Sequence, residues 1–360
     1  MASVHFALIG GGHPHSKAHL RTLQQLPEVE SILLVDPDEA VRASYADEKK
    51  VVRAVETLDE ALDGDVTHVF VCTRNDEAPD VIARCARAGR HIVAEKPLAV
   101  SEAAFEPARR AIEETGVAFT VMYQSRQHPI ALAARRVIAE GVLGTPIAAE
   151  ARMVTSQVRY RNPQHWLFDR ALAGGGILSW LGCHYLDLLV YLLDDEYASV
   201  AANVGTLTEE TIDVEDVAML SLRFRGGAIA SMTAGYLLAL SPSGYMRGAY
   251  DTYIGIYGTH GRLWWDPVGD TTLHVESAEE RWAPAPRRDA VFEIAQSPAY
   301  GGIYGEEFLR RFLRASEGDG APPCGLRDGI RILRVLDAAY RSAAEGVRVP
   351  IEGDLPGGNE

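Results

Sequence analysis

Cysteine is scarce in this chain of 360 residues, and its four copies show no C-x-x-C spacing. Isolated cysteines favour free thiols in a reducing compartment over a disulfide framework. No segment reaches the roughly 18 unbroken apolar residues of a membrane span. The N-terminus enters an apolar strand at once, without the charged and apolar regions of a signal peptide. We therefore expect a cytoplasmic protein that does not span a membrane.

Basic residues are also few: the chain has 35 Lys and Arg residues against 50 Asp and Glu residues, which gives a formal net charge of −15. Nucleic acids and anionic membrane surfaces require a basic face, so we expect neither as a main partner. Hydrophobic residues make up 47% of the chain and charged residues 24%, which is typical of globular proteins. The length suits two domains.

The start of the chain carries the most specific pattern. An apolar run at residues 4–9 ends in three glycines at 10–12, and a helix is expected at 16–26. A second apolar run at 31–35 then ends in Asp36. Strand, glycine turn, helix, strand and acid in this order are typical of a dinucleotide-binding βαβ unit.

Each residue of this pattern has a physical role in holding a dinucleotide. Gly10 permits a tight turn, and Gly12 lets the backbone approach a pyrophosphate at the helix N-terminus. Asp36 can accept hydrogen bonds from the ribose hydroxyls. The third glycine of G-x-G-x-x-G would fall at position 15, where this chain has His15. His15 is expected either to displace the helix or to point into the site.

Helices and strands continue to alternate up to about residue 125. Helices are expected at 40–48, 58–62, 77–88 and 101–115, and strands at 66–72, 91–94 and 117–122. Strands separated by helices predict a doubly wound parallel α/β sheet. Residues 1–125 are thus expected to form the first domain.

The second domain, expected at residues 126–345, has a different pattern of helices and strands. Helices are expected at 129–140, from the turn at Gly174 to 193, at 305–316 and at 326–345. Strands are expected at 147–154, 217–224 and 228–234 within a strand-rich region from 199 to 265. Consecutive strands joined by short turns predict an antiparallel or mixed sheet. Residues 346–360 are expected to form a C-terminal tail, loose from 355 onwards.

Four stretches carry a family resemblance: GGGHPH at 10–15, GRHIVAEKPLAV at 89–100, YQSRQHP at 123–129 and GGGILSWLGCHYLDLL at 174–189. The chain resembles the glucose–fructose oxidoreductase, inositol dehydrogenase and MocA family of NAD(P)-dependent oxidoreductases. The resemblance implies a Rossmann domain followed by an α+β domain with a large open, mostly antiparallel sheet. It also implies homodimers or homotetramers that form through this sheet.

Two residues are the candidate catalytic groups. Moving a hydride from a carbinol carbon requires removal of the hydroxyl proton and stabilisation of charge on the oxygen. Lys96 follows a strand at the carboxyl edge of the parallel sheet, where ligands bind, and the family uses the lysine of EKP in this role. The second candidate, His184, is a general acid/base near neutral pH. The structural alternatives are a surface lysine paired with Glu95 and a core histidine.

The family often has an acid four positions before this histidine, and this chain has Trp180 there. Tryptophan cannot accept a proton, but its flat face can stack against a sugar ring. Asp187 shares a helix face with His184 and could hydrogen-bond it or a sugar hydroxyl. The expected substrate-binding residues are Arg126, Trp166, Trp180 and Asp187, of which Trp166 is a weaker candidate, as are Tyr123 and His165. Tyr185 would also suit a polyol ligand.

The resemblance and the turn together give a set of cofactor contacts, with Glu95 expected at the nicotinamide ribose. The expected set is Gly10, Gly12, His13, Pro14, His15, Asp36, Thr73, Asn75, Glu95, Lys96 and Gln124. A carboxylate at Asp36 repels a 2′-phosphate, so NAD is expected over NADP, with Arg42 as the residue that could reverse this preference. No metal is expected at the histidines near the turn, because no cysteine or carboxylate nearby in sequence completes a ligand set.

We therefore predict an NAD(P)-dependent dehydrogenase or reductase acting on a secondary hydroxyl or carbonyl of a sugar, inositol or related polyol. One alternative is a redox-neutral enzyme with tightly bound NAD, which would cleave or epimerise a glycoside. Another is a nucleotide or sugar sensor without turnover, suggested by the missing family acid. The presence of both Lys96 and His184 favours an enzyme.

Overall fold

A six-stranded parallel sheet forms the N-terminal part of the computed structural model, which describes residues 3–243, 248–353 and 355. Its strands are β1 (Val4–Ile9), β2 (Val29–Val35), β3 (Val51–Val55), β4 (His68–Val71), β5 (His91–Ala94) and β6 (Phe119–Val121). The order across the sheet is β3-β2-β1-β4-β5-β6, as in a Rossmann fold. β4 is buried along its whole length because helices cover both faces of a parallel sheet.

Five helices connect these strands, and their ends follow local capping rules. They are α1 (Ser16–Gln25), α2 (Glu39–Ala43), α3 (Leu58–Leu62), α4 (Ala78–Arg87) and α5 (Glu102–Thr115). The Ser101 hydroxyl accepts the Ala104 amide at the start of α5. Gly116 ends α5 with a φ of +66°, which confirms the expected stop.

The second sheet has nine strands in the order β14-β13-β12-β11-β7-β10-β9-β8-β15. Its strands are β7 (Pro146–Ser156), β8 (Tyr197–Gly205), β9 (Val217–Phe224), β10 (Ile229–Leu238), β11 (Tyr250–Gly258), β12 (Gly261–Trp265), β13 (Thr272–Ser277), β14 (Arg287–Val291) and β15 (Val349–Pro350). All neighbouring strands pair antiparallel except β7 and β10, which pair parallel. The expected large, open, mostly antiparallel sheet is confirmed.

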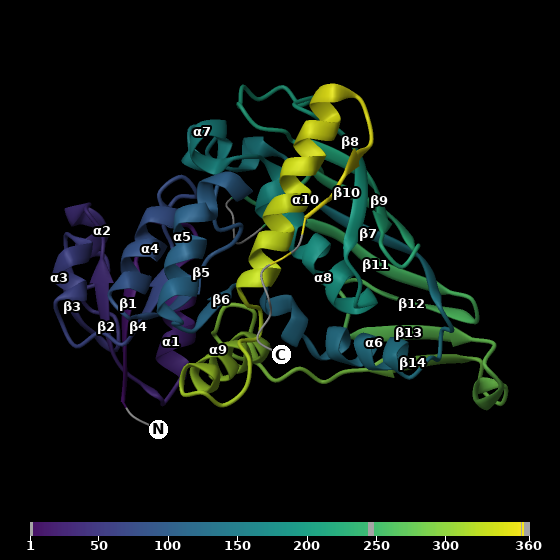
Figure 1. Ribbon diagram of the computed structural model, residues 1–360, viewed down its shortest axis with the longest axis horizontal. Coiled ribbons are helices and arrows are strands. Elements are labelled where there is room, and N and C mark those ends of the chain that lie inside the picture. Colours follow the sequence, from purple (N-terminus) through teal and green to yellow (C-terminus); the bar gives the residue numbers. More distant parts are fainter. Residues whose placement is uncertain (1–2, 244–247, 354, 356–360) are drawn as a thin grey trace.

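Within residues 3–243, 248–353 and 355, helices cover one face of this sheet and leave the other open (Figure 1). They are α6 (Pro129–Ala139), α8 (Cys183–Leu193) and α10 (Leu326–Glu345), while the short α7 (Arg170–Ala173) precedes α8. Along β9, buried and exposed residues alternate, which is the pattern of a strand with one face packed and one face open. The opposite face carries apolar side chains such as Ile147, Met219 and Ile229, which are about half exposed.

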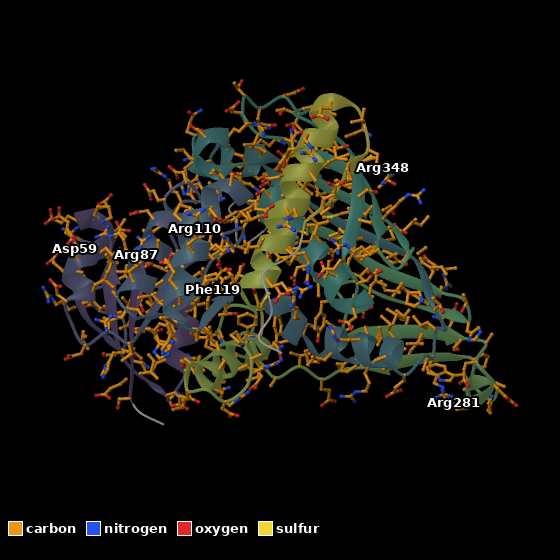
Figure 2. The ribbon with its side chains drawn as sticks, viewed as in Figure 1. Asp59, Arg87, Arg110, Phe119, Arg281 and Arg348 are labelled. Atoms are coloured by element: carbon orange, nitrogen blue, oxygen red, sulfur yellow. The ribbon has the colours of Figure 1, made fainter. Side chains whose placement is uncertain are left out.

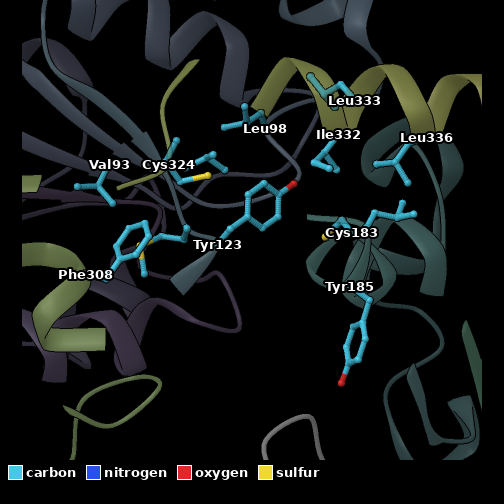
Figure 3. Packing of buried hydrophobic residues seen from close by; sticks show 14 of the residues in the cluster. Val93, Leu98, Tyr123, Cys183, Tyr185, Phe308, Cys324, Ile332, Leu333 and Leu336 are labelled. Carbon is cyan, nitrogen blue, oxygen red and sulfur yellow. The ribbon is translucent and has the colours of Figure 1, made fainter. Parts of the chain in front are cut away.

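The last helices return to the N-terminal domain. α9 (Ile303–Ser316) packs beside α1, and α10 crosses between the two sheets (Figure 1). Figure 3 shows Ile332, Leu333 and Leu336 of α10 among buried residues that include Tyr123 and Cys183. The two sheets therefore share one continuous hydrophobic core.

Charged side chains lie on the outside of both parts (Figure 2). Asp59, Arg87 and Arg110 mark the outer helices of the N-terminal domain, and Arg281 marks the far end of the second sheet. By length and composition, the stretch Arg170–Leu193 could cross a membrane, but 78% of its most apolar window is buried inside the protein. We assign it to the core of the second domain.

Several expected elements differ in the structure. The sequence pattern missed β3, because this edge strand is exposed at its centre and shows no hydrophobic alternation. The helix expected at 40–48 ends at Ala43. A π-helical turn at Leu178–Gly182 precedes α8. β15 orders part of the expected tail, and residues 354 and 356–360 of that tail lie outside the described residues.

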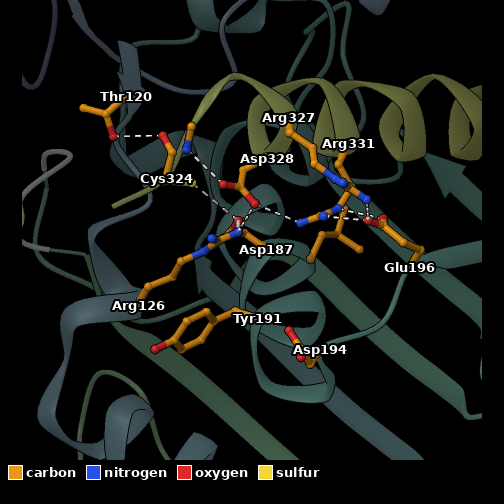
Figure 4. A network of polar contacts seen from close by, with 12 residues as sticks. Thr120, Arg126, Asp187, Tyr191, Asp194, Glu196, Cys324, Arg327, Asp328 and Arg331 are labelled. Carbon is orange, nitrogen blue, oxygen red and sulfur yellow. Dashed lines mark hydrogen bonds and ion pairs between the residues drawn. The ribbon is translucent and has the colours of Figure 1, made fainter. Parts of the chain in front are cut away.

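A buried ion pair connects the segment just after β6 to α8 and α10 (Figure 4). Arg126, just after β6, donates to both carboxylate oxygens of Asp187 in α8, at 2.8 and 2.5 Å. The same guanidinium donates to Asp328 in α10 at 3.0 Å. Asp187 is 1% exposed, and burial raises its carboxyl pKa to about 6 despite Arg126. This pair fixes α8 and α10 against the end of the parallel sheet.

Replacing Arg126→Met should destabilise the protein by about 3–5 kcal/mol, because Asp187 would become a buried carboxylate without its partner. The double variant Arg126→Met/Asp187→Leu should recover most of this loss. Urea unfolding of the three proteins measures the difference.

Arg327→Met is the matched control, since this guanidinium is 43% exposed and pairs with Glu196 at the rim of the same network. Its loss should cost less than about 1 kcal/mol. Equal losses for the two single variants would contradict a dominant role for the Arg126 pair.

Candidate active site

The glycine turn after β1 is tightly packed against the end of β4. Gly10 has a φ of +89°, and a Cβ there would lie 2.2 Å from the Cys72 carbonyl oxygen, so only glycine fits. The Gly12 amide donates to Asp36 Oδ2 at 2.9 Å, and the Asp38 amide donates to Oδ1 at 2.9 Å. Asp36 therefore fastens the turn to the end of β2 while keeping lone pairs for a ribose.

Glu95, which directly follows β5, is buried and contacts several polar groups of the site. Its Oε1 accepts hydrogen bonds from His15 Nδ1 at 3.1 Å and His19 Nε2 at 2.5 Å. Its Oε2 accepts the Lys96 amide at 3.1 Å and lies 3.8 Å from Lys96 Nζ. Burial alone would raise the pKa of the Glu95 carboxyl, but His15 and Lys96 hold it well below its usual range. Glu95 stays ionised and connects the turn, α1 and Lys96.

The Lys96 side chain is 1% exposed, which removes the alternative of a surface lysine. Its ammonium donates to the Trp180 carbonyl at 2.9 Å and lies 3.5 Å from the centroid of the Trp180 ring. A carbonyl dipole and a π face both stabilise a buried cation. The Lys96–Pro97 peptide bond is cis.

Trp180 lies in the π-helical turn, which the preceding glycines hold in place. A Cβ at Gly176 would lie 1.9 Å from the Glu215 carbonyl oxygen. The buried Glu215 carboxylate accepts the amides of Gly176 at 2.8 Å and Leu178 at 3.1 Å. The glycine turn is thus clamped to the sheet, and the clamp directs the Trp180 carbonyl toward Lys96.

An aromatic cluster surrounds Lys96. The His15 ring stacks on Trp180 at 4.9 Å, and the His13 ring lies 5.7 Å from both Trp166 and Trp180. Tyr300, in the loop before α9, contacts His15 at 5.0 Å. The structure thus brings the expected substrate residues Trp166 and Trp180 together with two of the expected cofactor residues.

His184 lies in the first turn of α8, with its ring 5.6 Å from that of Tyr123. Burial and the nearby Lys96 lower its pKa to about 3, so the ring is neutral at physiological pH. His184 Nδ1 has no hydrogen-bond partner among the described residues. Of the two roles considered for Asp187, the hydrogen bond to His184 is not formed, because both Asp187 oxygens accept from Arg126. The structure places Arg126 and Asp187 in an ion pair and not beside Lys96.

Other expected cofactor residues lie at the edge of the sheet. Within the described residues, His13 Nε2, Thr73 Oγ1 and Gln124 Oε1 are buried and without partners. Buried polar atoms of this kind are usually satisfied, so they fit hydrogen bonds to a bound molecule. Asn75 instead donates to the Ala173 carbonyl at 2.8 Å and ties the loop to α7. Pro14 lies within the turn between His13 and His15.

The sequence argument that no carboxylate joins the histidines near the turn is wrong, because Glu95 lies between His15 and His19. The three could offer ligands to a metal. However, His19 Nε2 and Glu95 Oε1 are 2.5 Å apart, whereas two ligands of one tetrahedral zinc lie about 3.4 Å apart. We assign these contacts as hydrogen bonds.

Comparison with known proteins agrees with this geometry. Residues 4–123 match the model of an oxidoreductase family with an NAD-binding Rossmann fold, and residues 131–264 match the GFO/IDH/MocA C-terminal domain. The 1,5-anhydro-D-fructose reductase of Ensifer adhaerens is 30% identical over 318 residues, covering 87% of this chain and 88% of that enzyme. The chain belongs to the GFO/IDH/MocA oxidoreductase family.

Two further proteins align along almost the whole chain. The inositol 2-dehydrogenase of Rhizobium meliloti (strain 1021) is 26% identical over 354 residues, covering 97% of this chain and 99% of that enzyme. A levoglucosan dehydrogenase, solved in complex with NADH and levoglucosan, superposes with a TM-score of 0.85 at 23% identity. That superposition covers 98% of this chain and all of the other.

The sequence analysis did not identify two features of the site: Tyr300 and the bond between His19 and Glu95. Tyr300 is far from the other site residues along the chain, and no local motif marks it. The bond between His19 and Glu95 spans 76 positions. Only the spacing of His15 and His19, one helical turn apart, indicated that both rings face the same side.

We expect the His184 ring to remain neutral between about pH 5 and pH 8, because its pKa of about 3 lies below that window. Histidine ring NMR signals of the protein, assigned with the His184→Asn variant, should show no titration of His184 in this range. Because unfolding raises this pKa to its ordinary value, stability from this group is present at neutral pH and lost as the pH falls. A midpoint above pH 5 would contradict the assignment.

Proposed function

We propose that this protein is an NAD-dependent dehydrogenase that interconverts a secondary hydroxyl and a carbonyl on a sugar, inositol or related polyol. The observation that carries the proposal is the buried Lys96 ammonium at the carboxyl end of β5, with His184 close enough for Lys96 to lower its pKa. The names of the relatives support the substrate class: an anhydrofructose reductase and an inositol dehydrogenase.

Bound NAD supplies the acceptor for the hydride that leaves the carbinol carbon. Lys96 binds the substrate oxygen; as the neutral amine it takes the hydroxyl proton during oxidation and so becomes the ammonium, and as the ammonium it returns this proton during reduction. Its charge also stabilises the negative charge that develops on this oxygen. Neutral His184 offers a second hydrogen bond, and the faces of Trp166 and Trp180 pack against the ring of the substrate.

For the cofactor, we propose NAD over NADP because Asp36 occupies the end of β2. Its carboxylate would repel a 2′-phosphate. Arg42 donates to the carbonyls of Asp36 and Pro37, at 2.8 and 2.9 Å, so backbone acceptors occupy its guanidinium. Among the described residues, Thr73 Oγ1 and Gln124 Oε1 are buried without partners, which supports their assignment as cofactor contacts.

We further propose a homodimer or homotetramer that forms through the uncovered face of the nine-stranded sheet, where Ile147, Met219 and Ile229 are exposed. The four cysteines are free and buried, which supports a cytoplasmic location. Domain boundaries near residues 125 and 345 remain our proposal for the division of the chain.

Lys96→Ala should lower turnover by about 10²–10⁴-fold while NADH binding is retained, because the variant loses the proton-transfer group and keeps the cofactor turn. The assay supplies NAD with a panel of sugars and polyols and follows NADH. Lys17→Ala is the matched control, since this lysine donates to the Ser44 carbonyl at the surface of α1.

Two results would count against the proposal. A rate for Lys96→Ala within a few-fold of the unsubstituted protein would remove the catalytic assignment. Product formation without net NADH would instead favour the redox-neutral reaction.

Asp36→Asn should weaken NADH binding roughly 10–100-fold, because a hydrogen bond from a ribose hydroxyl to a charged carboxylate contributes about 1.5–3 kcal/mol. The ratio of the NADPH and NADH dissociation constants should also fall. Titration with both nucleotides, followed by tryptophan fluorescence, measures the ratio. Asp38→Asn, which alters only the exposed cap of α2, serves as the control. An unchanged ratio in Asp36→Asn would exclude this carboxylate as the selecting group.

A further inference from the structure

Protein groups surround the Lys96 ammonium on three sides. It donates to the Trp180 carbonyl at 2.9 Å, lies 3.8 Å from Glu95 Oε2, and faces the Trp180 ring, whose centroid is 3.5 Å away. With these contacts in place the Lys96 side chain is 1% exposed. A substrate oxygen needs a position within hydrogen-bond distance of this nitrogen, so one of the three groups has to move before the substrate can bind.

Two of the three groups are fixed. The Trp180 carbonyl belongs to the backbone of the π-helical turn, which the buried Glu215 carboxylate holds by accepting two of its neighbouring amides. Glu95 accepts hydrogen bonds from two histidines on one oxygen and from the Lys96 amide on the other. The Trp180 ring is the third group. It turns about single bonds, so it is the part of this arrangement that can uncover Lys96.

The neighbours of the Trp180 ring indicate the direction in which it moves. The His13 and His15 rings, at 5.7 and 4.9 Å, are both buried. The Trp166 ring meets the Trp180 ring edge to face at 6.3 Å, and Trp166 is only partly buried. Rotation of the indole toward Trp166 therefore leads from the core toward the protein surface and away from the Lys96 ammonium.

We propose that Trp180 selects cyclic polyols over small acyclic alcohols, an inference that rests on the proposed dehydrogenase function. In the free protein the indole covers Lys96. A cyclic substrate compensates for the contact that is broken, because its ring packs against the face of the displaced indole while its oxygen binds Lys96. A small acyclic alcohol has no ring to offer, so it has to displace the indole without compensation.

The cover acts on each substrate through the fraction of molecules in which Lys96 is open. The apparent affinity of a substrate is its affinity for the open form reduced by that fraction. A minor conformation is populated at about 10% or less, so a substrate without compensation loses about tenfold or more. A cyclic substrate recovers this loss, since contact with the indole makes it bind the open form more tightly.

The kinetic test compares glycerol with the best cyclic polyol found for the full-length protein with NAD. Trp180→Ala should raise kcat/KM for glycerol about tenfold, because the cover is removed and this substrate loses no ring contact. The cyclic polyol should show no comparable gain, since the variant also removes the face on which its ring packs. The ratio of the two specificity constants therefore falls.

Trp282→Ala is the matched control for this substitution. Its indole also lies over a cation, with the Arg288 guanidinium 3.9 Å from the ring centroid. It directly follows Arg281, which marks the far end of the second sheet (Figure 2). Both specificity constants should stay unchanged in this control.

Access to Lys96 can be measured without any substrate. The chain has four lysines, Lys17, Lys49, Lys50 and Lys96, so reductive methylation followed by mass spectrometry reports on each amine. In the unsubstituted protein Lys96 should react about tenfold or more slowly than the exposed Lys17, and Trp180→Ala should raise its rate about tenfold. Trp180→Phe should give an intermediate rate, because a benzene ring attracts a cation less than an indole does. This conservative variant also tests the cover if Trp180→Ala does not fold.

The outcomes separate this inference from the proposed function. If the unsubstituted protein transfers no hydride from any polyol to NAD, the dehydrogenase function falls and the selectivity falls with it. If it turns over, but Trp180→Ala brings no gain with glycerol or no faster methylation of Lys96, only the role of Trp180 is overturned. A gain with glycerol together with faster methylation supports the cover, because loss of a merely structural contact lowers activity on both substrates.

Discussion

The buried carboxylate of Glu95 is the interaction on which the site depends. A charge in this position requires compensation, since an uncompensated buried ion costs several kcal/mol. Two histidines from the glycine turn and α1, and the amide and ammonium of Lys96, supply that compensation. The same contacts place the end of β5 against the start of α1. The contacts that compensate the charge of Glu95 therefore also hold together the end of the sheet at which the cofactor is proposed to bind.

A second buried charge links this end of the sheet to the rest of the protein. Arg126 follows β6, and its partners Asp187 and Asp328 belong to α8 and α10. Hydrophobic packing of α10 brings the two sheets together, but apolar contacts allow sliding. A bidentate ion pair has one good geometry. We infer that it sets the register of α8, and with it the distance from His184 to Lys96.

Local signals in the sequence predicted much of the fold. β1, Gly10, α1 and Asp36 follow one another closely, and the caps of α5 lie beside the helix that they end, so neighbouring residues decide these features. β3 was missed because its exposed centre lacks a pattern. The site was predicted less completely. The spacing of His184 and Asp187 indicated a pair, but the competing Arg126 lies 61 positions away from Asp187 along the chain. Tyr300 and His15 are 285 positions apart, and nothing in either neighbourhood indicates the contact.

The pairing of β7 also has a consequence for how the chain folds. β7 is flanked by β10 and β11, which come much later in the chain, after the glycine turn and α8 have been made. Both edges of β7 stay unpaired during synthesis until β10 and β11 have been made. Pairing these distant strands closes long loops of chain, which is slow. Unpaired strand edges readily join other chains. The second sheet is therefore the part of this protein for which assistance by a chaperone during synthesis matters most.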